Sequence, residues 1–228
     1  MRAIIIANHA DADGGEVAAR FARHGWVFET WNREQAPEWA PLSGDVGLVV
    51  PLGSDWSVYW EDIAPFVAAE AAILRVAHGR GVPIFGICFG GQMLAHALGG
   101  RVERAEQPEI GWFGVDCTPE MTPFLAQNPW FQWHYDRFLP PAGAAVLATG
   151  EQGVQAFRLG RSLGLQFHPE VTPAIVERWS SGQGAAELAR VGIDRDDLIA
   201  STRSHAHVSA AAAHRLVDWF AEHVMTAL

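Results

Sequence analysis

Two short segments of the sequence contain residue types that could carry out nucleophilic catalysis. The first covers residues 86–92 and places Cys88 in a Gly-x-Cys-x-Gly pattern. The second covers residues 167–170 and contains His168 followed, two positions later, by Glu170. A cysteine thiolate is a strong nucleophile, a histidine can move its proton, and a carboxylate can hold that histidine in one tautomer. The two segments therefore predict a Cys-His-Glu catalytic triad.

The residues around Cys88 predict a sharp turn between a strand and a helix. Residues 82–87 form a short apolar run, which is typical of a buried parallel strand. The glycines that frame Cys88 allow a tight turn, and residues 92–98 favour a helix that ends at a glycine pair. A thiol at the start of a helix lies near the positive end of the helix dipole, which favours the thiolate. This arrangement has the form of a nucleophile elbow.

The segment around His168 is less specific on its own. Leu163, Leu165 and Phe167 alternate as in a strand, and His168 stands at the end of it. A single histidine at a strand end is more often structural than catalytic. Its assignment to catalysis therefore depends on Cys88 and on Glu170.

Composition limits the class of protein. The chain has 228 residues, 49% of them hydrophobic and 18% charged, which fits one sizeable globular domain. The formal net charge of −10 argues against nucleic-acid binding. The two cysteines indicate no disulfide framework, and the short apolar start fits neither a signal peptide nor a membrane span. We expect a cytoplasmic protein without metal or cofactor. The ten tryptophans fit either a tryptophan-rich core or an oligomer surface.

Alternating patterns predict an α/β fold with a doubly wound, mostly parallel sheet and helices on both faces. The segments expected to be strands are 3–7, 26–31, 46–50 and 82–87, and those expected to be helices are 14–24 and 61–78. Beyond residue 100, short runs at 101–104, 111–117, 144–149, 154–159 and 162–167 predict a few added antiparallel strands. The last part favours helices at 173–179, 185–191, 196–202 and 206–225. We divide the chain into a domain at 1–180 and a helical extension at 181–228 packed on the same domain.

The two segments together resemble the class I glutamine amidotransferase family, whose fold is flavodoxin-like. Residues 86–92 look like the nucleophile block of that family, Gly-x-Cys-x-Gly-x-Gln, and residues 167–170 look like its histidine-glutamate block. Residues 51–54 fall where the family has a glycine-rich oxyanion loop. The resemblance extends over roughly residues 1–180.

The resemblance implies a role for each matching residue. Cys88 would attack a glutamine side-chain carboxamide to form a thioester, while His168 would transfer protons and Glu170 would orient His168. Backbone N–H groups of Gly53 and Phe89 would form the oxyanion hole. The residues implied in substrate binding are Gln92, Trp133, His134, Tyr135 and Asp136. For His134, packing beside the aromatic residues is an equal alternative.

Two segments depart from the family pattern. The oxyanion loop of the family usually reads Gly-Gly-Pro, whereas residues 52–54 read Leu-Gly-Ser and keep one glycine. Residues 132–136 resemble a His-x-Asp segment of the guanylate synthase branch, which faces a synthetase partner there. Tyr135 replaces a small residue of that segment, which would narrow the pocket or change its substrate.

Three functions stay open at this stage. The chain has no P-loop for ATP and no length for an acceptor domain, so it would pass ammonia to a separate synthetase subunit or act alone. Acting alone, it would be a γ-glutamyl peptidase or hydrolase with a small-molecule substrate. A protein of the same fold that binds or regulates without turnover is the third alternative, and a homo-oligomer is compatible with all three.

Overall fold

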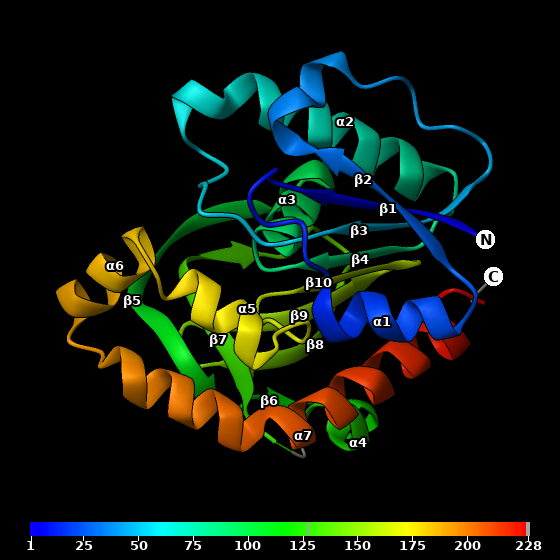
Figure 1. Cartoon of the computed structure of the whole chain (residues 1–228). Helices are drawn as coiled ribbons and strands as arrows, with labels where there is room; N and C mark the ends of the chain where they lie inside the picture. The colour runs from blue at the N-terminus through cyan, green and yellow to red at the C-terminus, as the bar shows by residue number, and fades with distance from the viewer. Residues whose placement is uncertain (127, 227–228) are drawn as a thin grey trace.

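A central, mostly parallel β-sheet forms the middle layer of the protein (Figure 1). The computed structural model describes residues 1–126 and 128–226, and the following account refers to them. Parallel pairing joins the first five strands of the sheet and antiparallel pairing joins the rest. In sheet order the strands are β2 (Val27–Asn32), β1 (Arg2–Ala7), β3 (Val46–Pro51), β4 (Ile84–Ile87), β10 (Ser162–Leu165), β9 (Gly153–Leu159), β8 (Ala145–Gly150) and β6 (Asp116–Cys117).

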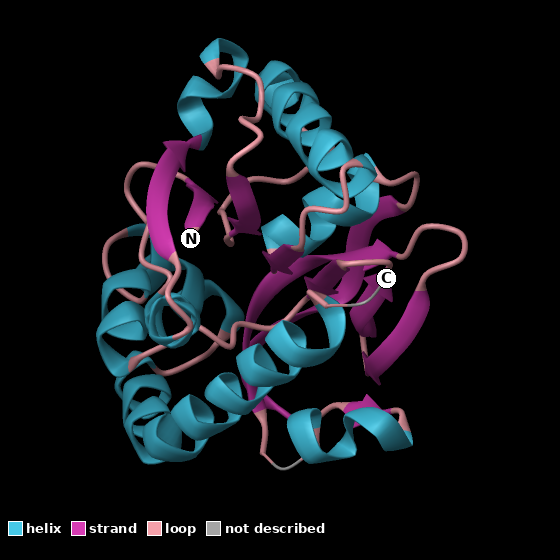
Figure 2. Ribbon diagram, turned by 90° about the vertical axis from the view of Figure 1, so that its right-hand side faces the viewer, coloured by secondary structure: helices cyan, strands magenta, loops and turns pink. Residues whose placement is uncertain are grey.

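Helices cover both faces of this sheet, as the quarter-turned view also shows (Figure 2). One face packs against α1 (Gly15–Arg23) and α7 (Arg195–Trp219), and the other packs against α2 (Ala64–Gly79) and α3 (Phe89–Ala97). This arrangement confirms the predicted fold class. The remaining helical segments are η1 (Arg33–Glu38), η2 (Glu61–Ile63), η3 (Pro119–Met121), α4 (Thr122–Leu125), α5 (Pro173–Trp179), α6 (Gln183–Val191) and η4 (Phe220–Val224).

The central strands are mostly apolar because both of their faces are buried, and the exceptions are Arg2 at the start of β1 and Ser162 at the start of β10. In β1, Ala3 and Ile5 belong to the core beside α1 and α7, whereas Ile4 and Ile6 belong to the core beside α2. Successive side chains of a strand point to opposite faces, so a strand covered on both sides must be apolar at every position. The continuous apolar runs in the sequence follow from this burial.

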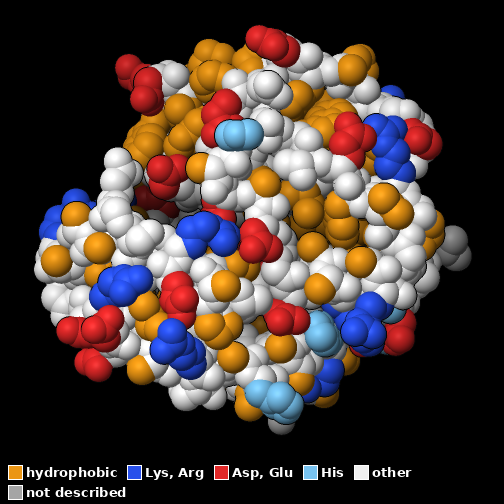
Figure 3. All heavy atoms as spheres, viewed as in Figure 1, with side chains coloured by type: hydrophobic (Ala, Val, Ile, Leu, Met, Phe, Trp, Pro, Cys, Tyr) orange, Lys and Arg blue, Asp and Glu red, His pale blue; other side chains and the backbone are white. Residues whose placement is uncertain are grey.

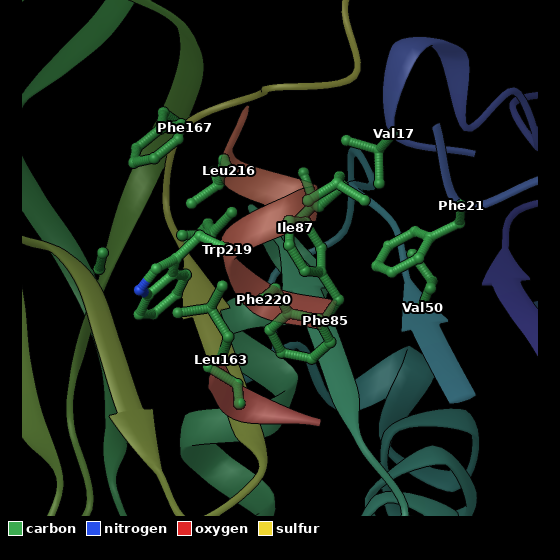
Figure 4. Packing of buried hydrophobic residues seen from close by; sticks show 14 of the residues in the cluster. Val17, Phe21, Val50, Phe85, Ile87, Leu163, Phe167, Leu216, Trp219 and Phe220 are labelled. Atoms are coloured by element: carbon green, nitrogen blue, oxygen red, sulfur yellow. The ribbon is translucent and has the colours of Figure 1, made fainter. Parts of the chain in front are cut away.

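Aromatic rings join the C-terminal helix to the centre of the sheet (Figure 4). Phe85 of β4 lies edge-on to Phe220, with ring centroids 5.1 Å apart, and to Phe21 of α1, with centroids 5.6 Å apart. Phe21 and Phe220 also meet edge-on. All three rings are fully buried. The end of α7 and the turn η4 are therefore part of the core that supports β4.

Replacement of Phe220 by alanine is expected to lower the free energy of unfolding by about 3–5 kcal/mol, because it leaves a cavity between the end of α7 and β4. Denaturant unfolding followed by circular dichroism measures the change. Val208→Ala, on α7 but exposed, is the matched control and should change stability by less than about 0.5 kcal/mol. An effect of Phe220→Ala no larger than that of the control would show that the end of α7 is not integrated with the core.

A second, two-stranded sheet lies beside the first and differs from the sequence-based prediction. β5 (Arg101–Phe113) pairs antiparallel with β7 (Trp130–Leu139), and a register shift between Arg104 and Glu109 bends the ribbon. We expected short strands at 101–104 and 111–117 and none at 130–139. Polar residues alternate with aromatic ones over residues 132–136 of β7, and there the polar side chains are the buried ones. Trp130, Phe131 and Phe138, towards the two ends of the strand, are buried as well. Hydrophobic patterning did not predict this strand, because polar side chains are buried where apolar ones are usually expected.

Two helical segments also differ from the prediction. The helices expected at 196–202 and 206–225 are one helix, α7, that continues into the π-helical turn η4. The polar residues between them contain no proline or glycine that would break a helix. Thr202 and Ser204 instead bond back to the backbone carbonyls of Leu198 and Ser201. Between β2 and β3, where no helix was predicted, the chain forms the 3-10 helix η1.

Candidate active site

Three neighbouring strands end at the same edge of the sheet and bring the predicted catalytic residues together. β3, β4 and β10 are adjacent and parallel, and they lead to Gly53, Cys88 and His168 respectively. Loops at the carboxyl ends of parallel strands form the ligand sites of α/β folds. Strand order therefore brings together residues that are up to 115 positions apart in the chain.

Cys88 lies on a strained turn between β4 and α3. It has φ = 50° and ψ = −110°, and it is the only non-glycine residue with positive φ in the part of the chain that the structure describes. The strain is held by close backbone packing, since a Cβ at Gly90 would collide with the carbonyl of Pro51 and one at Gly91 with the carbonyl of Leu165. The glycines after Cys88 therefore allow the helix start to press against β3 and β10.

His168 is oriented by Glu170 and is directed towards Cys88. Nδ1 of His168 donates to Oε1 of Glu170 at 2.7 Å, and both side chains are almost completely buried. Nε2 of the same ring is buried and makes no hydrogen bond of normal geometry within the described residues. One ring nitrogen is thus fixed by a carboxylate, and the other is free to serve a reacting group.

The electrostatic surroundings favour the protonated form of His168. Burial alone lowers the pKa of His168, but the negative charges of Glu170 and Cys88 outweigh it and hold this pKa well above the usual 6.5. The charged ring stabilises the fold fully at a pH below about 6.5, and this contribution is lost as the pH rises through the raised pKa. These charges therefore favour the imidazolium form of His168, which can donate a proton.

Gly53 borders the same space. A Cβ placed on Gly53 would lie 3.0 Å from Cε1 of His168 and 3.7 Å from Cβ of Cys88. The backbone of Gly53 can approach these side chains closely because no side chain intervenes. Phe89, whose N–H belongs to the unpaired first turn of α3, lies next to Cys88 on the other side.

Aromatic rings enclose His168. Trp179 of α5 meets the imidazole edge-on with centroids 4.9 Å apart, and Phe131 of β7 approaches it at 6.4 Å. Trp133 in turn meets Trp179 edge-on at 6.3 Å. These rings keep water from the imidazole and restrict its rotation, which strengthens the electrostatic interactions within the site.

A buried glutamine that the sequence analysis did not select contacts Cys88. Nε2 of Gln166 lies 3.8 Å from Sγ of Cys88, and its Oε1 lies 3.4 Å from Nε2 of Gln92. Gln92 also donates to the backbone carbonyl of Asp136 at 3.2 Å. Gln92 therefore ties α3 to β7 beneath Cys88. The signal for Gln166 was a polar residue within the apolar segment 163–167.

The predicted substrate-binding segment lies on β7, with its backbone near Cys88. The carbonyl oxygen of Trp133 is 4.0 Å from Sγ of Cys88. The ring of His134 is occupied elsewhere, because its Nε2 is 3.0 Å from Oε1 of Gln132 and 3.1 Å from Oε2 of Glu109. The structure thus places His134 in a buried polar network on the far side of the strand from Trp133.

Side chains from two other segments hold Asp136 and Tyr135. Asp136 accepts hydrogen bonds from the hydroxyls of Ser57 and Tyr59, the latter at 2.8 Å. Arg104 lies 3.5 Å from the same carboxylate and stacks over the ring of Tyr135 at 4.3 Å. The carboxylate of Asp136 therefore anchors the 54–60 loop, and only the backbone of this residue is directed at Gln92.

Three further observations concern the charge distribution, membrane-spanning helices and metal ligands. Acidic, basic and hydrophobic side chains are interspersed over the face shown in Figure 3. No helix within residues 1–126 and 128–226 has the length and apolar character needed to cross a membrane. Among the same residues, no three His, Cys, Asp or Glu side chains are grouped as metal ligands.

Comparison with known protein families identifies the family to which the chain belongs. The model of the family described as glutamine amidotransferase class-I matches residues 61–177, which is just over half of the chain and includes Cys88, His168 and Glu170. The chain belongs to the class I glutamine amidotransferase family. The sequence-based recognition of the family is thereby confirmed.

Relatives by sequence are glutamine-hydrolysing enzymes. The chain is 35% identical over 174 residues to a glutamine-hydrolysing GMP synthase of Aeropyrum pernix, covering 72% of this chain and 32% of that protein. It is 38% identical over 97 residues to a glutamine-hydrolysing GMP synthase subunit of Sulfolobus acidocaldarius, covering 40% of this chain and 52% of that protein. The chain spans about a third of the length of the GMP synthases that it matches.

Solved structures of this family share the fold over nearly the whole chain. A glutamine amidotransferase from Thermotoga maritima superimposes with a TM-score of 0.87 at 28% identity, covering 97% of this chain and 98% of that one. A glutamine amidotransferase from Methylobacillus flagellatus gives a TM-score of 0.79 at 21% identity and covers 96% and 93% of the two chains. The second likeness concerns the fold alone.

Proposed function

We propose that this class I amidotransferase hydrolyses the side-chain amide of glutamine through a thioester on Cys88. The observation that carries the proposal is the state of His168. Its Nδ1 is fixed by Glu170, while its buried Nε2 has no other partner within the described residues and its raised pKa depends on Cys88. A histidine held in this way is suited to serve a neighbouring thiol.

The first half of the reaction transfers the glutamyl group to the enzyme. The Cys88 thiolate attacks the carboxamide carbon, a C–S bond forms, and the carbonyl oxygen becomes an oxyanion. The N–H groups of Gly53 and Phe89 stabilise that oxyanion. The proton on Nε2 of His168 passes to the amide nitrogen, the C–N bond breaks, and ammonia leaves.

The second half returns the enzyme to its starting state. Neutral His168 takes a proton from water, and the resulting hydroxide attacks the thioester carbon. The C–S bond breaks, glutamate leaves, and the thiolate is paired again with imidazolium. Glu170 keeps the imidazole in the correct tautomer in both halves, and Trp133, Tyr135 and Asp136 offer backbone groups for the α-amino and α-carboxylate groups of the substrate.

We further propose that the ammonia passes to a separate synthetase protein. The observation in favour is the likeness to a GMP synthase subunit that is named as glutamine-hydrolysing. A panel of glutamine, asparagine and γ-glutamyl peptides, assayed for ammonia and glutamate release with and without a co-purified synthetase, tests this role. Turnover of γ-glutamyl peptides in preference to glutamine would instead indicate a peptidase.

Replacement of Glu170 by glutamine is expected to shift the pH profile of glutamine hydrolysis as well as its rate. The carboxylate contributes to the raised pKa of His168, so its loss lowers that pKa. The alkaline limb of kcat/KM should therefore move towards lower pH, with a fall in kcat of about 10²–10⁴-fold. Initial rates measured from pH 5 to pH 10 (roughly the range that spans a perturbed histidine) report both effects.

A matched control for this variant is Glu177→Gln. Glu177 is half-exposed on α5 and forms a surface ion pair with Arg203. The control should leave the pH profile unchanged because it makes the same chemical change away from the site. An unshifted alkaline limb in Glu170→Gln would contradict the assigned role of this carboxylate.

A further inference from the structure

A buried arginine lies behind the loop that carries Gly53. Arg33 is the first residue of η1, after the carboxyl end of β2, and its side chain is only 1% exposed. Its Nε donates to Glu70 of α2 at 2.7 Å, and its Nη1 donates to the side chain of Asn8 at 2.6 Å. Burial of the two charges costs solvation free energy, and Glu70 and Asn8 compensate part of that cost by accepting hydrogen bonds from the guanidinium.

The remaining donors of the guanidinium hold the backbone of the loop. Nη2 donates to the carbonyl of Leu52 at 3.1 Å, and Nη1 approaches the carbonyl of Gly53 at 3.4 Å. Nη2 also approaches the carbonyl of Ile6 at 3.4 Å. One planar side chain therefore ties two consecutive carbonyls of the loop to the end of β1 and to α2.

Fixing the Leu52 carbonyl also fixes the direction of the Gly53 N–H group. A trans peptide unit is planar, and its C=O and N–H point in opposite directions. With its carbonyl held by Arg33, the Leu52–Gly53 peptide presents its N–H to the side away from the guanidinium. Gly53 borders Cys88 and His168, so this donor is available where the oxyanion forms.

The same guanidinium contacts the residue that carries the second donor. Its carbon Cζ lies 4.8 Å from the ring centroid of Phe89, directly after the nucleophile. This cation–π contact joins Arg33 to the start of α3. Arg33 therefore contacts both residues whose N–H groups are implied in the oxyanion hole: Gly53 through its carbonyl and Phe89 through its ring.

The loop sequence explains why such an anchor is needed in this chain. Pro51 ends β3, and residues 52–54 read Leu-Gly-Ser, so no proline ring restricts the backbone after Pro51. Ser54 instead accepts a hydrogen bond from the N–H of Trp56 at 3.1 Å, which shapes only the following turn. The carbonyls before Ser54 are held by Arg33.

We propose that Arg33 is a positioning residue that sets the oxyanion hole, with Glu70 as its counter-ion. The inference rests on the proposed amide hydrolysis and adds a device that determines its rate. Arg33 does not touch the substrate. It acts by holding the Leu52–Gly53 peptide in the one orientation that aims the Gly53 N–H at the developing negative charge.

Two variants test this role. Arg33→Lys keeps the positive charge. The lysine ammonium has only three N–H donors, whereas the planar guanidinium has five, so the loop carbonyls lose donors that are fixed in position. In Arg33→Met/Glu70→Met both charges are removed, so neither is left unpaired in the interior. The matched control is Arg20→Met/Asp218→Met, which removes a bidentate pair between α1 and α7, away from the site.

We expect kcat for glutamine to fall by about 10²-fold in both Arg33 variants with KM unchanged, as for the loss of one oxyanion donor. A glutamate γ-semialdehyde inhibitor, which forms an oxyanion on addition of Cys88, should bind more weakly by a similar factor. Alkylation of Cys88 by iodoacetamide, which forms no oxyanion, should keep its wild-type rate. The control variant should behave as the wild type in all three assays.

Crystal structures of the variants give a readout that does not depend on turnover. Rotation of the Leu52–Gly53 peptide in the variants supports the inference, and an unmoved peptide overturns it. Equal losses in aldehyde binding and iodoacetamide alkylation, or a change in KM alone, also overturn it, because they indicate a general structural role. A wild-type protein that cleaves no amide in the panel refutes the proposed function, and the peptide orientation then still decides the role of Arg33.

Discussion

Cys88→Ala is expected to reduce glutamine hydrolysis by at least about 10⁴-fold, to the level of the uncatalysed background. No other described side chain stands on the strained corner between β4 and α3, so no substitute nucleophile is available. The fold should be retained, since alanine is smaller than cysteine and the turn is held by backbone packing at Gly90 and Gly91. Ammonia release in a coupled assay gives the rate, and circular dichroism verifies the fold.

Cys117→Ala is the control for this variant. Cys117 is half-buried on β6, at the far edge of the sheet from the site, and lies near Thr122. Its replacement should leave turnover unchanged. Persistent hydrolysis by Cys88→Ala, at a rate comparable with that of the control, would refute the thioester mechanism.

His168→Ala is expected to cause a loss of similar size, about 10⁴-fold or more in kcat, because both the proton donor for ammonia and the base for water are removed. Residues that act as one unit are not additive in their effects. The double variant Cys88→Ala/His168→Ala should therefore be no slower than either single variant. The comparison is made from initial rates of the three proteins under one set of conditions.

The exposed His207 of α7 supplies the control, since His207→Ala removes the same ring from the surface. Its rate should equal that of the wild type. If His168→Ala retained most of the activity, the raised pKa of this histidine would reflect structural pairing with Glu170 rather than catalysis.

The parallel half of the fold could be predicted because its strands are buried on both faces. Segments such as 3–7 and 82–87 are apolar at every position, and the glycines around Cys88 reveal the turn that follows. The ribbon of β5 and β7 could not be predicted in the same way. Its buried face carries Gln132, His134 and Asp136, which satisfy one another and their neighbours by hydrogen bonds. Hydrophobic patterning does not reveal a strand whose interior is polar.

The three residues of the proposed triad could be selected from residue type and position, whereas the residues that support them could not. Cys88, His168 and Glu170 belong to short local patterns, and strand order then brings them to one edge of the sheet. Arg33 and Glu70 are 37 positions apart and belong to no local pattern. The fold pairs them because η1 packs against α2.

The central claim is that Cys88 is the nucleophile of a site that recognises glutamine. Labelling with a glutamine-mimicking alkylator, followed by peptide mapping with mass spectrometry, tests it most directly, because Cys117 provides an internal comparison in the same molecule. We predict one label per chain, on Cys88, with protection by excess glutamine and no label on Cys117. Equal labelling of both cysteines, absence of label on Cys88, or labelling that glutamine does not slow would contradict the claim.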